Sequence, residues 1–284
     1  MSHESGNRFH AVGHALNPDV AQPLFSRSFG QGPRSVLAIH CTIAHSGAWR
    51  GLAGEMEGEV TLITPDMLSH GRSPDWDREG DYQDRMVEGI APLLDQRMDV
   101  IGHSFGATVA LRLAVDHPDR IRSLTLIEPV FFAVAAVDDP EALERHETDA
   151  APFIQALDTG DEALGARLFN RMWNGGIGPR WPDLPEQTRA AMIRGIHVVP
   201  ECRDAIYDDL AGVLAPGMLD RLTMPVQLLR GSHTHPIIGV ITDGLQRRLP
   251  NARSAVIEGA GHMVPISHPK DTATQIRALF KEAP

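Results

Sequence analysis

A serine flanked by glycines places the strongest constraint on the fold of this chain. Residues 102–106 read Gly-His-Ser-Phe-Gly and match the pattern G-x-S-x-G. The apolar run 98–101 before them is typical of a short buried strand, and residues 107–115, rich in helix formers and free of Gly and Pro, are typical of a helix. Between a strand and a helix, Ser104 must lie in a tight, strained turn, where glycines avoid collisions with neighbouring backbone. Such a turn exposes the serine Oγ and directs the first helical N–H groups at the group it attacks.

Length and composition indicate a soluble globular protein. The 284 residues can form one large domain, or a core domain with an insertion. The formal net charge of −11 argues against nucleic acid and against anionic membrane as partners, because both repel an acidic surface. The chain has no apolar run of membrane-spanning length, and its first 19 residues lack the apolar stretch of a secretion signal, so we expect a cytoplasmic protein. The distant Cys41 and Cys202 form no redox or metal motif and are expected to be reduced thiols.

Short apolar runs alternate with helical stretches from residue 35 onward. The predicted strands are residues 36–39, 60–63, 98–101, 124–127, 226–229 and 254–257, and the predicted helices between them are 107–117, 237–248 and 271–281. Runs this short and apolar suit strands of a parallel sheet that is covered on both faces. The alternation predicts the α/β class, with a mostly parallel, doubly wound sheet.

The alternation stops between residues 131 and 222. This segment holds helical patches and no convincing strand; the patches are residues 140–146, 163–172 and 185–196. We expect 131–222 to form a helical cap over the carboxyl edge of the sheet, where ligands bind in such folds. The core would then comprise residues 23–130 and 223–284, preceded by a flexible lead-in at 1–22.

A serine nucleophile requires a base that accepts its proton, and position favours His262 among the 14 histidines. It lies in Gly-Ala-Gly-His-Met (259–263), after the last predicted strand and before the last helix, so its loop can reach the carboxyl edge of the sheet. The alternative is a loop histidine without a catalytic role. Four residues are candidates for lining the substrate pocket, although each also fits ordinary packing: Trp49, His103, Trp173 and Met263.

Four segments together resemble the α/β-hydrolase family. Residues 39–42, Ile-His-Cys-Thr, stand with Trp49 where that family has its H-G-x oxyanion loop, and 65–73 resemble its P-D-x-x-G-H-G-x-S segment. Residues 102–106 resemble its nucleophile elbow, and 259–262 its catalytic-histidine loop. The resemblance covers 36–130 and 223–281. It implies an α/β-hydrolase fold with a helical cap and a serine hydrolase that needs no cofactor.

The resemblance also implies an oxyanion hole. Its donors would be the backbone N–H groups of Phe105 and Thr42, each stabilising the transition state by about 3 kcal/mol in comparable sites. Cys41 replaces the second glycine of the family's H-G pair, and we expect its side chain to alter the loop and narrow the pocket. Three further polar residues are expected to fix loops rather than to catalyse: Asp66, His70 and Ser73.

The acid that orients the histidine is absent from its usual place. The family carries an Asp just beyond strand 7 in a G-x-x-D setting, where this chain has His233, which cannot stabilise an imidazolium. Glu128 directly follows the predicted strand 124–127, where some α/β-hydrolases, notably a subset of haloalkane dehalogenases, carry their acid. A carboxylate there can meet Nδ1 of His262, and the order Ser104, Glu128, His262 keeps the nucleophile–acid–base sequence. The alternative is that Glu128 only begins a turn before Pro129, with its carboxylate in solvent.

The expected reaction is hydrolysis of a carboxylic ester or related acyl compound, with a small, largely uncharged molecule as substrate. Serine at position 104 excludes the dehalogenases and epoxide hydrolases of this fold, which form an alkyl ester on an Asp. Lactone, thioester and carbon–carbon bond hydrolysis and perhydrolysis remain compatible, as does a non-catalytic receptor that uses the pocket. The run His233-Thr234-His235 could place two imidazoles on one side of a strand end, but no third ligand of suitable spacing is visible, so we predict no metal site.

Overall fold

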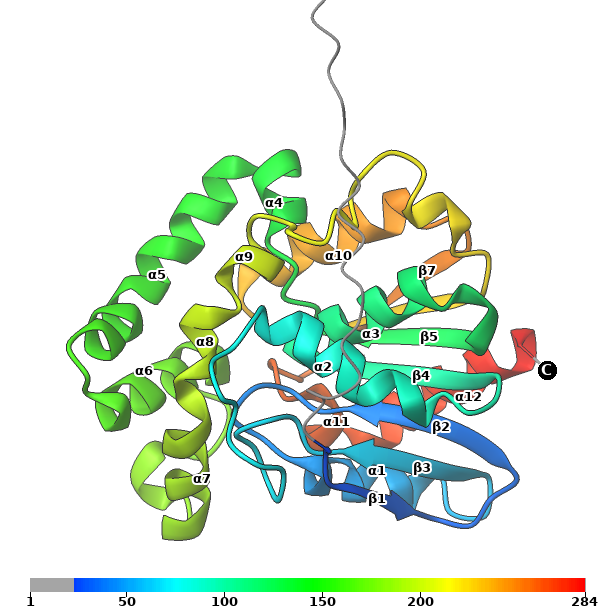
Figure 1. Ribbon diagram of the computed structural model, residues 1–284, viewed down its shortest axis with the longest axis horizontal. Helices are drawn as coiled ribbons and strands as arrows, with labels where there is room; N and C mark the ends of the chain where they lie inside the picture. The colour runs from blue at the N-terminus through cyan, green and yellow to red at the C-terminus, as the bar shows by residue number, and fades with distance from the viewer. Residues whose placement is uncertain (1–22, 284) are drawn as a thin grey trace, which may run out of the picture.

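The computed structural model describes residues 23–283 and shows a seven-stranded sheet with helices on both faces (Figure 1). The strand order is β1-β3-β2-β4-β5-β6-β7, and β1 pairs antiparallel with β3 while the other neighbours are parallel. The strands are β1 (Ser26–Phe29), β2 (Arg34–Ile39), β3 (Val60–Pro65), β4 (Met98–His103), β5 (Ile121–Ile127), β6 (Val226–Gly231) and β7 (Ala252–Ile257). This arrangement confirms the predicted mostly parallel α/β sheet. The predicted lead-in, 1–22, lies outside the described residues.

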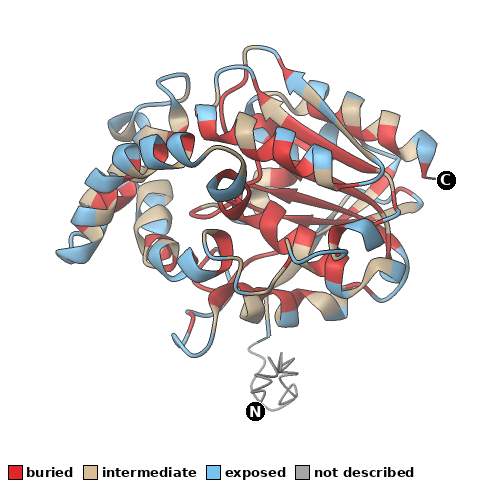
Figure 2. Ribbon diagram, turned by 90° about the horizontal axis from the view of Figure 1, so that it is seen from above, coloured by how far each residue is buried: buried red, intermediate tan, exposed pale blue. Residues whose placement is uncertain are grey.

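Alternate residues of the central strands face two separate cores, which explains why the strands read as continuous apolar runs. In β2, Leu37 and Ile39 pack into one core and Val36 and Ala38 into the other. The first core contains residues of α2 (Tyr82–Ile90), α3 (Phe105–Asp116) and α10 (Pro236–Arg248), and the second contains residues of α1 (Arg50–Glu55), α11 (Val264–Ser267) and α12 (Pro269–Glu282). Figure 2 shows the buried sheet between these helical layers. Each fully buried aliphatic side chain stabilises the fold by about 1.5–3 kcal/mol.

The segment between β5 and β6, called the cap below, contains helices and no strand. Its helices are α4 (Ala133–Asp138), α5 (Pro140–Asp158), α6 (Glu162–Asn174), α7 (Glu186–Ile196), α8 (Val198–Glu201) and α9 (Arg203–Ile206). They lie to one side of the sheet in Figure 1. The predicted patch 140–146 is too short, because α5 continues through Pro152 and buries Ala150, Phe153 and Ala156. Asp139 and Asp161 cap α5 and α6 by accepting hydrogen bonds from backbone N–H groups in the first turns.

Short 3-10 helices complete the described chain: η1 (Ser46–Trp49), η2 (Ala91–Leu93), η3 (Pro118–Arg120), η4 (Trp181–Asp183) and η5 (Leu219–Arg221). No helix within residues 23–283 combines the length and the apolar character needed to cross a membrane.

Candidate active site

Ser104 lies in a strained turn between β4 and α3. Its backbone has φ 57° and ψ −120°, a conformation that residues with a side chain rarely adopt. A Cβ at Gly102 would lie 2.2 Å from the carbonyl oxygen of Gly106, and one at Gly106 would lie 2.4 Å from that of His40. Both glycines are therefore required by the close approach of backbone. The amide of Ser104 donates a 2.8 Å hydrogen bond to the carbonyl of Ile127, which ties the turn to β5.

His262 lies between Ser104 and Glu128 at the carboxyl edge of the sheet. Its Nε2 is 2.9 Å from Oγ of Ser104, and its Nδ1 is 2.9 Å from Oε2 of Glu128. His262 follows β7 and is 4% exposed, whereas Glu128 follows β5 and is fully buried. The parallel sheet thus brings together three residues that lie up to 158 positions apart in the sequence. An exposed Glu128 carboxylate, the alternative drawn from the sequence, does not occur.

Two donors hold the Glu128 carboxylate, one at the carboxyl end of β6 and one in the loop that follows it. The amide of Gly231 donates to Oε1 at 2.6 Å, and the hydroxyl of Thr234 donates to Oε2, the oxygen that also faces His262. Hydrogen bonds of this kind offset the large cost of burying a carboxylate. No sequence pattern indicates this role of Thr234, although it lies beside His233, the place expected for the acid. His233 itself is exposed, and its Nδ1 lies 3.2 Å from Oγ of Ser232.

His103 contacts the backbone of His262 and does not line the cavity. This corrects the expectation that its side chain lines the substrate pocket. Its Nε2–H donates a 2.8 Å hydrogen bond to the backbone carbonyl of His262. Burial lowers the pKa of His103 to about 3, so the ring is neutral near pH 7 and carries a single N–H for this bond. His103 therefore fixes the backbone from which the His262 ring projects.

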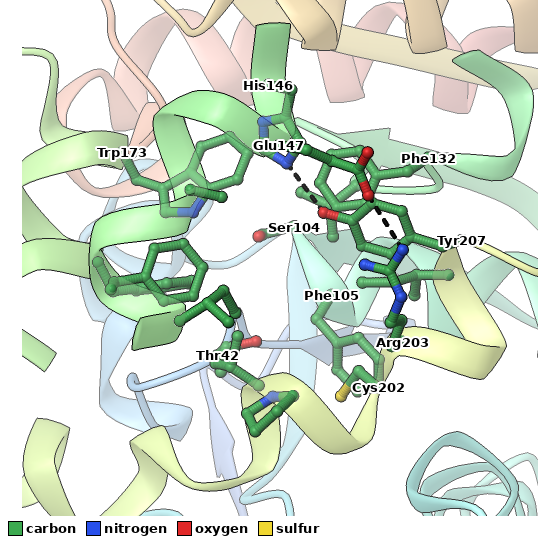
Figure 3. A pocket seen from close by; sticks show the side chains of 18 of the residues that line it. Thr42, Ser104, Phe105, Phe132, His146, Glu147, Trp173, Cys202, Arg203 and Tyr207 are labelled. Carbon is green, nitrogen blue, oxygen red and sulfur yellow. Dashed lines mark hydrogen bonds and ion pairs between the residues drawn. The ribbon is translucent and has the colours of Figure 1, made fainter. Parts of the chain in front are cut away.

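The two predicted oxyanion-hole residues share one cavity with Ser104. Thr42 and Phe105 both line the cavity that contains the Ser104 hydroxyl (Figure 3). Phe105 is the first residue of α3, and the first N–H groups of an α-helix have no intrahelical acceptor. Cys41 is buried and is not among the residues that line the cavity, so the expected narrowing of the pocket by its side chain does not occur.

Two neutral histidines hold the loop that carries Thr42. Nε2 of His40 accepts a 3.0 Å hydrogen bond from the amide of Met67, and Nε2 of His70 accepts a 2.9 Å bond from the amide of Ile43. Burial lowers the pKa of His40 to about 4 and that of His70 to about 3. Each ring is therefore neutral near pH 7 and has a lone pair with which it accepts.

Asp66 and Ser73 also fix loops in this region. The Asp66 carboxylate accepts hydrogen bonds from the amides of Ser46 at 2.6 Å and Arg72 at 2.9 Å. The Ser73 hydroxyl donates to the backbone carbonyl of Asp66 at 2.6 Å and accepts from the amide of Phe25 at 2.9 Å. These contacts bind the segment after β3 to η1 and to the residue before β1.

A cavity of about 440 Å³ lies between Ser104 and the cap. Its wall is mainly apolar and comes largely from α5, α6, α8 and α9; its aromatic residues include Phe105, Phe132, Phe153, Phe169, Trp173 and Tyr207. Of the four residues expected to line the pocket, Trp173 does so, and its ring centroid lies 4.4 Å from that of His262. The other aromatic residues of the cap are not predicted from the sequence, because helical spacing alone does not separate a face turned to a cavity from one turned to a core.

Trp49 and Met263 do not line this cavity, which corrects two further expectations. Trp49 is 1% exposed and packs in the core beneath α1 and α12, because the 3-10 helix η1 turns its side chain inward. Met263 is half-buried at the start of α11, outside the set of residues that line the cavity.

The histidines of residues 233–235 make separate contacts. His235 accepts a 3.3 Å hydrogen bond from the amide of Ile237 through Nδ1, at the start of α10, and its Nε2 lies 3.2 Å from a carboxylate oxygen of Asp149. Across residues 23–283, no three His, Cys, Asp or Glu side chains are grouped in a way that could hold a metal ion.

Comparisons with known proteins agree with this architecture. The alpha/beta hydrolase family matches residues 36–275. Lipase LipV of Mycobacterium tuberculosis is 30% identical over 264 residues, covering 87% of this chain and 93% of the lipase. Pimeloyl-[acyl-carrier protein] methyl ester esterase of Nitrosomonas europaea is 27% identical over 256 residues, covering 88% and 96%.

Among solved structures, MenH from S. aureus superposes with a TM-score of 0.67 at 17% identity, over 91% of this chain and 98% of MenH. At this identity the likeness shows the shared fold alone. The family match spans most of the chain and includes the segments that carry Ser104, Glu128 and His262. The chain therefore belongs to the alpha/beta hydrolase family of enzymes.

Proposed function

We propose that this protein hydrolyses carboxylic esters of small, uncharged molecules through an acyl-enzyme on Ser104. The observation that carries the proposal is the position of His262, with its two ring nitrogens 2.9 Å from Ser104 Oγ and Glu128 Oε2. A histidine placed in this way can take the serine proton while a carboxylate stabilises the resulting imidazolium.

Ser104 Oγ attacks the ester carbonyl carbon as its proton passes to Nε2 of His262, whose Nδ1–H donates to Glu128. The N–H groups of Phe105 and Thr42 stabilise the oxyanion of the tetrahedral intermediate. His262 then protonates the departing alkoxide, which leaves as the alcohol and yields the acyl-enzyme. A water molecule, deprotonated by His262, releases the acid by the reverse sequence and restores the serine.

One observation favours an ester as the substrate, and a second favours a neutral molecule. The relatives at 27–30% identity carry the names of a lipase and a methyl ester esterase, both hydrolases of esters. Residues 131–222, which supply most of the cavity wall, contain sixteen Asp and Glu against eight Arg and no Lys, a formal charge of −8. This charge repels anionic substrates, and it equally disfavours nucleic acid and anionic membrane as partners.

Substitution of Ser104 tests the proposal. Ser104→Ala should abolish both labelling by a fluorophosphonate probe and turnover of a short-chain p-nitrophenyl ester. Ser254→Ala is the matched control, because Ser254 is exposed on β7 and its hydroxyl contacts only Gln246 among the described residues. A Ser104→Ala variant that keeps its labelling or its turnover contradicts the proposal. A wild-type protein that binds the ester without cleaving it would indicate a receptor instead.

A further inference from the structure

A hydrogen-bonded polar pair interrupts the apolar wall of the cap cavity. His146, from the middle of α5, and Tyr207, directly after α9, both line the cavity, and Nε2 of His146 lies 3.1 Å from the Tyr207 hydroxyl (Figure 3). The His146 ring stacks on Phe132 with a centroid distance of 4.3 Å and stands edge-on to His235 at 5.1 Å. Ester cleavage by Ser104 requires neither residue of the pair.

Both members of the pair are neutral near pH 7. Burial lowers the pKa of His146 to about 3 and raises the pKa of the Tyr207 hydroxyl above its usual value. The pair thus holds two polar hydrogens, one on the imidazole and one on the phenol, and one of them is used between the two residues. The other is available for a third group.

The surroundings of Nδ1 of His146 determine which ring nitrogen carries the imidazole hydrogen, and therefore which hydrogen of the pair stays free. Nδ1 is buried and has no hydrogen-bond partner among the described residues. A hydrogen on Nδ1 would therefore be an unpaired buried donor, which is strongly unfavourable. With the hydrogen on Nε2, His146 donates to the Tyr207 oxygen, and the Tyr207 O–H remains free to donate toward the cavity.

We infer that the Tyr207 hydroxyl, oriented by His146, selects esters that carry a second, neutral oxygen acceptor on the chain bound in the cap cavity. This inference rests on the proposed ester hydrolysis. A chain with a carbonyl or ether oxygen at the right distance satisfies the donor, whereas a plain alkyl chain displaces water and leaves it unpaired.

The neighbouring charges favour a neutral acceptor over a carboxylate. Arg203 is the one cationic residue of the cavity wall within the described chain, and it is paired with Glu147 at 3.0 Å. Its guanidinium also packs over the Tyr207 ring, 4.5 Å from the centroid. Glu147 and Asp158 both line the cavity, so an anionic chain end would meet negative charge beside a neutralised arginine.

The test uses Tyr207→Phe, which removes the O–H and keeps the ring that packs on Phe132 and Arg203. Two series of esters of graded chain length are compared. The first consists of p-nitrophenyl esters of ω-oxo acids, and the second consists of acetates of oxo-alkanols. Each ester is measured beside its alkyl isostere, which lacks the oxo group. For the wild-type protein, kcat/KM for each oxo ester is divided by kcat/KM for its alkyl isostere. In one series, this ratio should reach a maximum at one chain length. Tyr207→Phe should lower that ratio about three- to tenfold, the range for one neutral hydrogen bond.

A purely structural role for Tyr207 would lower kcat/KM for both esters of a pair and leave their ratio unchanged. Phe169→Leu serves as the control, because it alters the apolar wall without removing a polar group and should shift both esters alike. An unchanged ratio for Tyr207→Phe in both series overturns the inference while ester hydrolysis stands. If wild-type protein cleaves neither ester of any pair, the proposed function itself is contradicted.

Discussion

Three donors from separate segments determine where the Glu128 carboxylate lies. Gly231 is the last residue of β6, Thr234 lies in the loop after β6, and His262 approaches from the loop after β7. Thr234 and His262 contact the same carboxylate oxygen, Oε2. The hydrogen bond from the threonine hydroxyl therefore determines which lone pair of Oε2 is available to the imidazole. Thr234 thus positions the Glu128 carboxylate and is not among the residues that line the cavity.

Thr234→Val should lower kcat/KM for a short p-nitrophenyl ester about tenfold and leave KM nearly unchanged. Loss of one hydrogen bond to a charged group costs about 1.5–3 kcal/mol, part of which weakens the support for His262. Thr234→Ser keeps the hydroxyl and should retain most of the activity, as steady-state kinetics can measure. A loss in the Ser variant together with full activity in the Val variant would show that the methyl group, and not the hydroxyl, matters.

The sequence predicts the positions of Ser104, His262 and Glu128 because Ser104 and Glu128 directly follow apolar strands and His262 lies in the loop after the last strand. Parallel strands end at one edge of the sheet. The role of each in catalysis remains a prediction. Thr234 and Tyr207 could not be found in this way. Their contacts join loops and helices more than 60 residues apart, and nothing in their local sequence marks which neighbour they meet.

At the scale of elements, the first turn of α3 packs directly on the backbone that leaves β2. Gly106 lies so close to His40 that only a hydrogen fits at its Cα. This contact sets the distance between the loop of Thr42 and the amide of Phe105, the two proposed donors to the oxyanion.

Gly106→Ala should destabilise the fold by about 3 kcal/mol and lower kcat, because the new methyl group would lie 2.4 Å from the His40 carbonyl oxygen and must push the loop away. Gly54→Ala in α1 is the matched control, since its new methyl group would have no described atom within 4 Å and alanine favours a helix by about 0.5–1 kcal/mol. Urea unfolding of both variants measures these free energies. A neutral or stabilising effect of Gly106→Ala would contradict the close packing.

The sequence predicts those elements correctly that are buried on both faces. Central strands buried on both faces, such as β4, appear in the sequence as apolar runs. The edge strand β1 (Ser26–Phe29) reads Ser-Arg-Ser-Phe and has no such run, because it pairs only with β3. The second half of α5 is not predicted because Pro152 suggests an end, whereas the helix continues and buries Phe153.

At the scale of the whole molecule, several buried neutral histidines couple stability to pH. Burial lowers their pKa values well below the ordinary 6.5, so at pH 5 each is neutral in the folded chain and protonated in the unfolded chain. Stability is therefore complete above about pH 6.5 and falls as the pH drops toward the folded-state values. The residues concerned, with folded-state pKa values of about 3 to about 4, are His40, His70, His103 and His146.

We expect the free energy of unfolding to fall between pH 7 and pH 5 by about 2 kcal/mol for each of these histidines. Urea unfolding at the two pH values measures the fall, and His146→Gln, which removes one of the four groups, should show a smaller one. A free energy of unfolding that does not change between pH 7 and pH 5 would contradict the burial of these rings in the neutral form.

The assignment of Glu128 as the acid is tested most directly by kcat/KM of Glu128→Gln on a short p-nitrophenyl ester, measured beside Asp243→Asn. Gln keeps the size of the side chain but cannot stabilise the imidazolium of His262, so we expect kcat/KM to fall by about 10⁴-fold. Asp243, the next acid downstream of His233, is exposed on α10, and its substitution should leave activity unchanged. A folded Glu128→Gln variant within tenfold of wild type, or an equal loss in Asp243→Asn, would contradict a Ser104–His262–Glu128 triad.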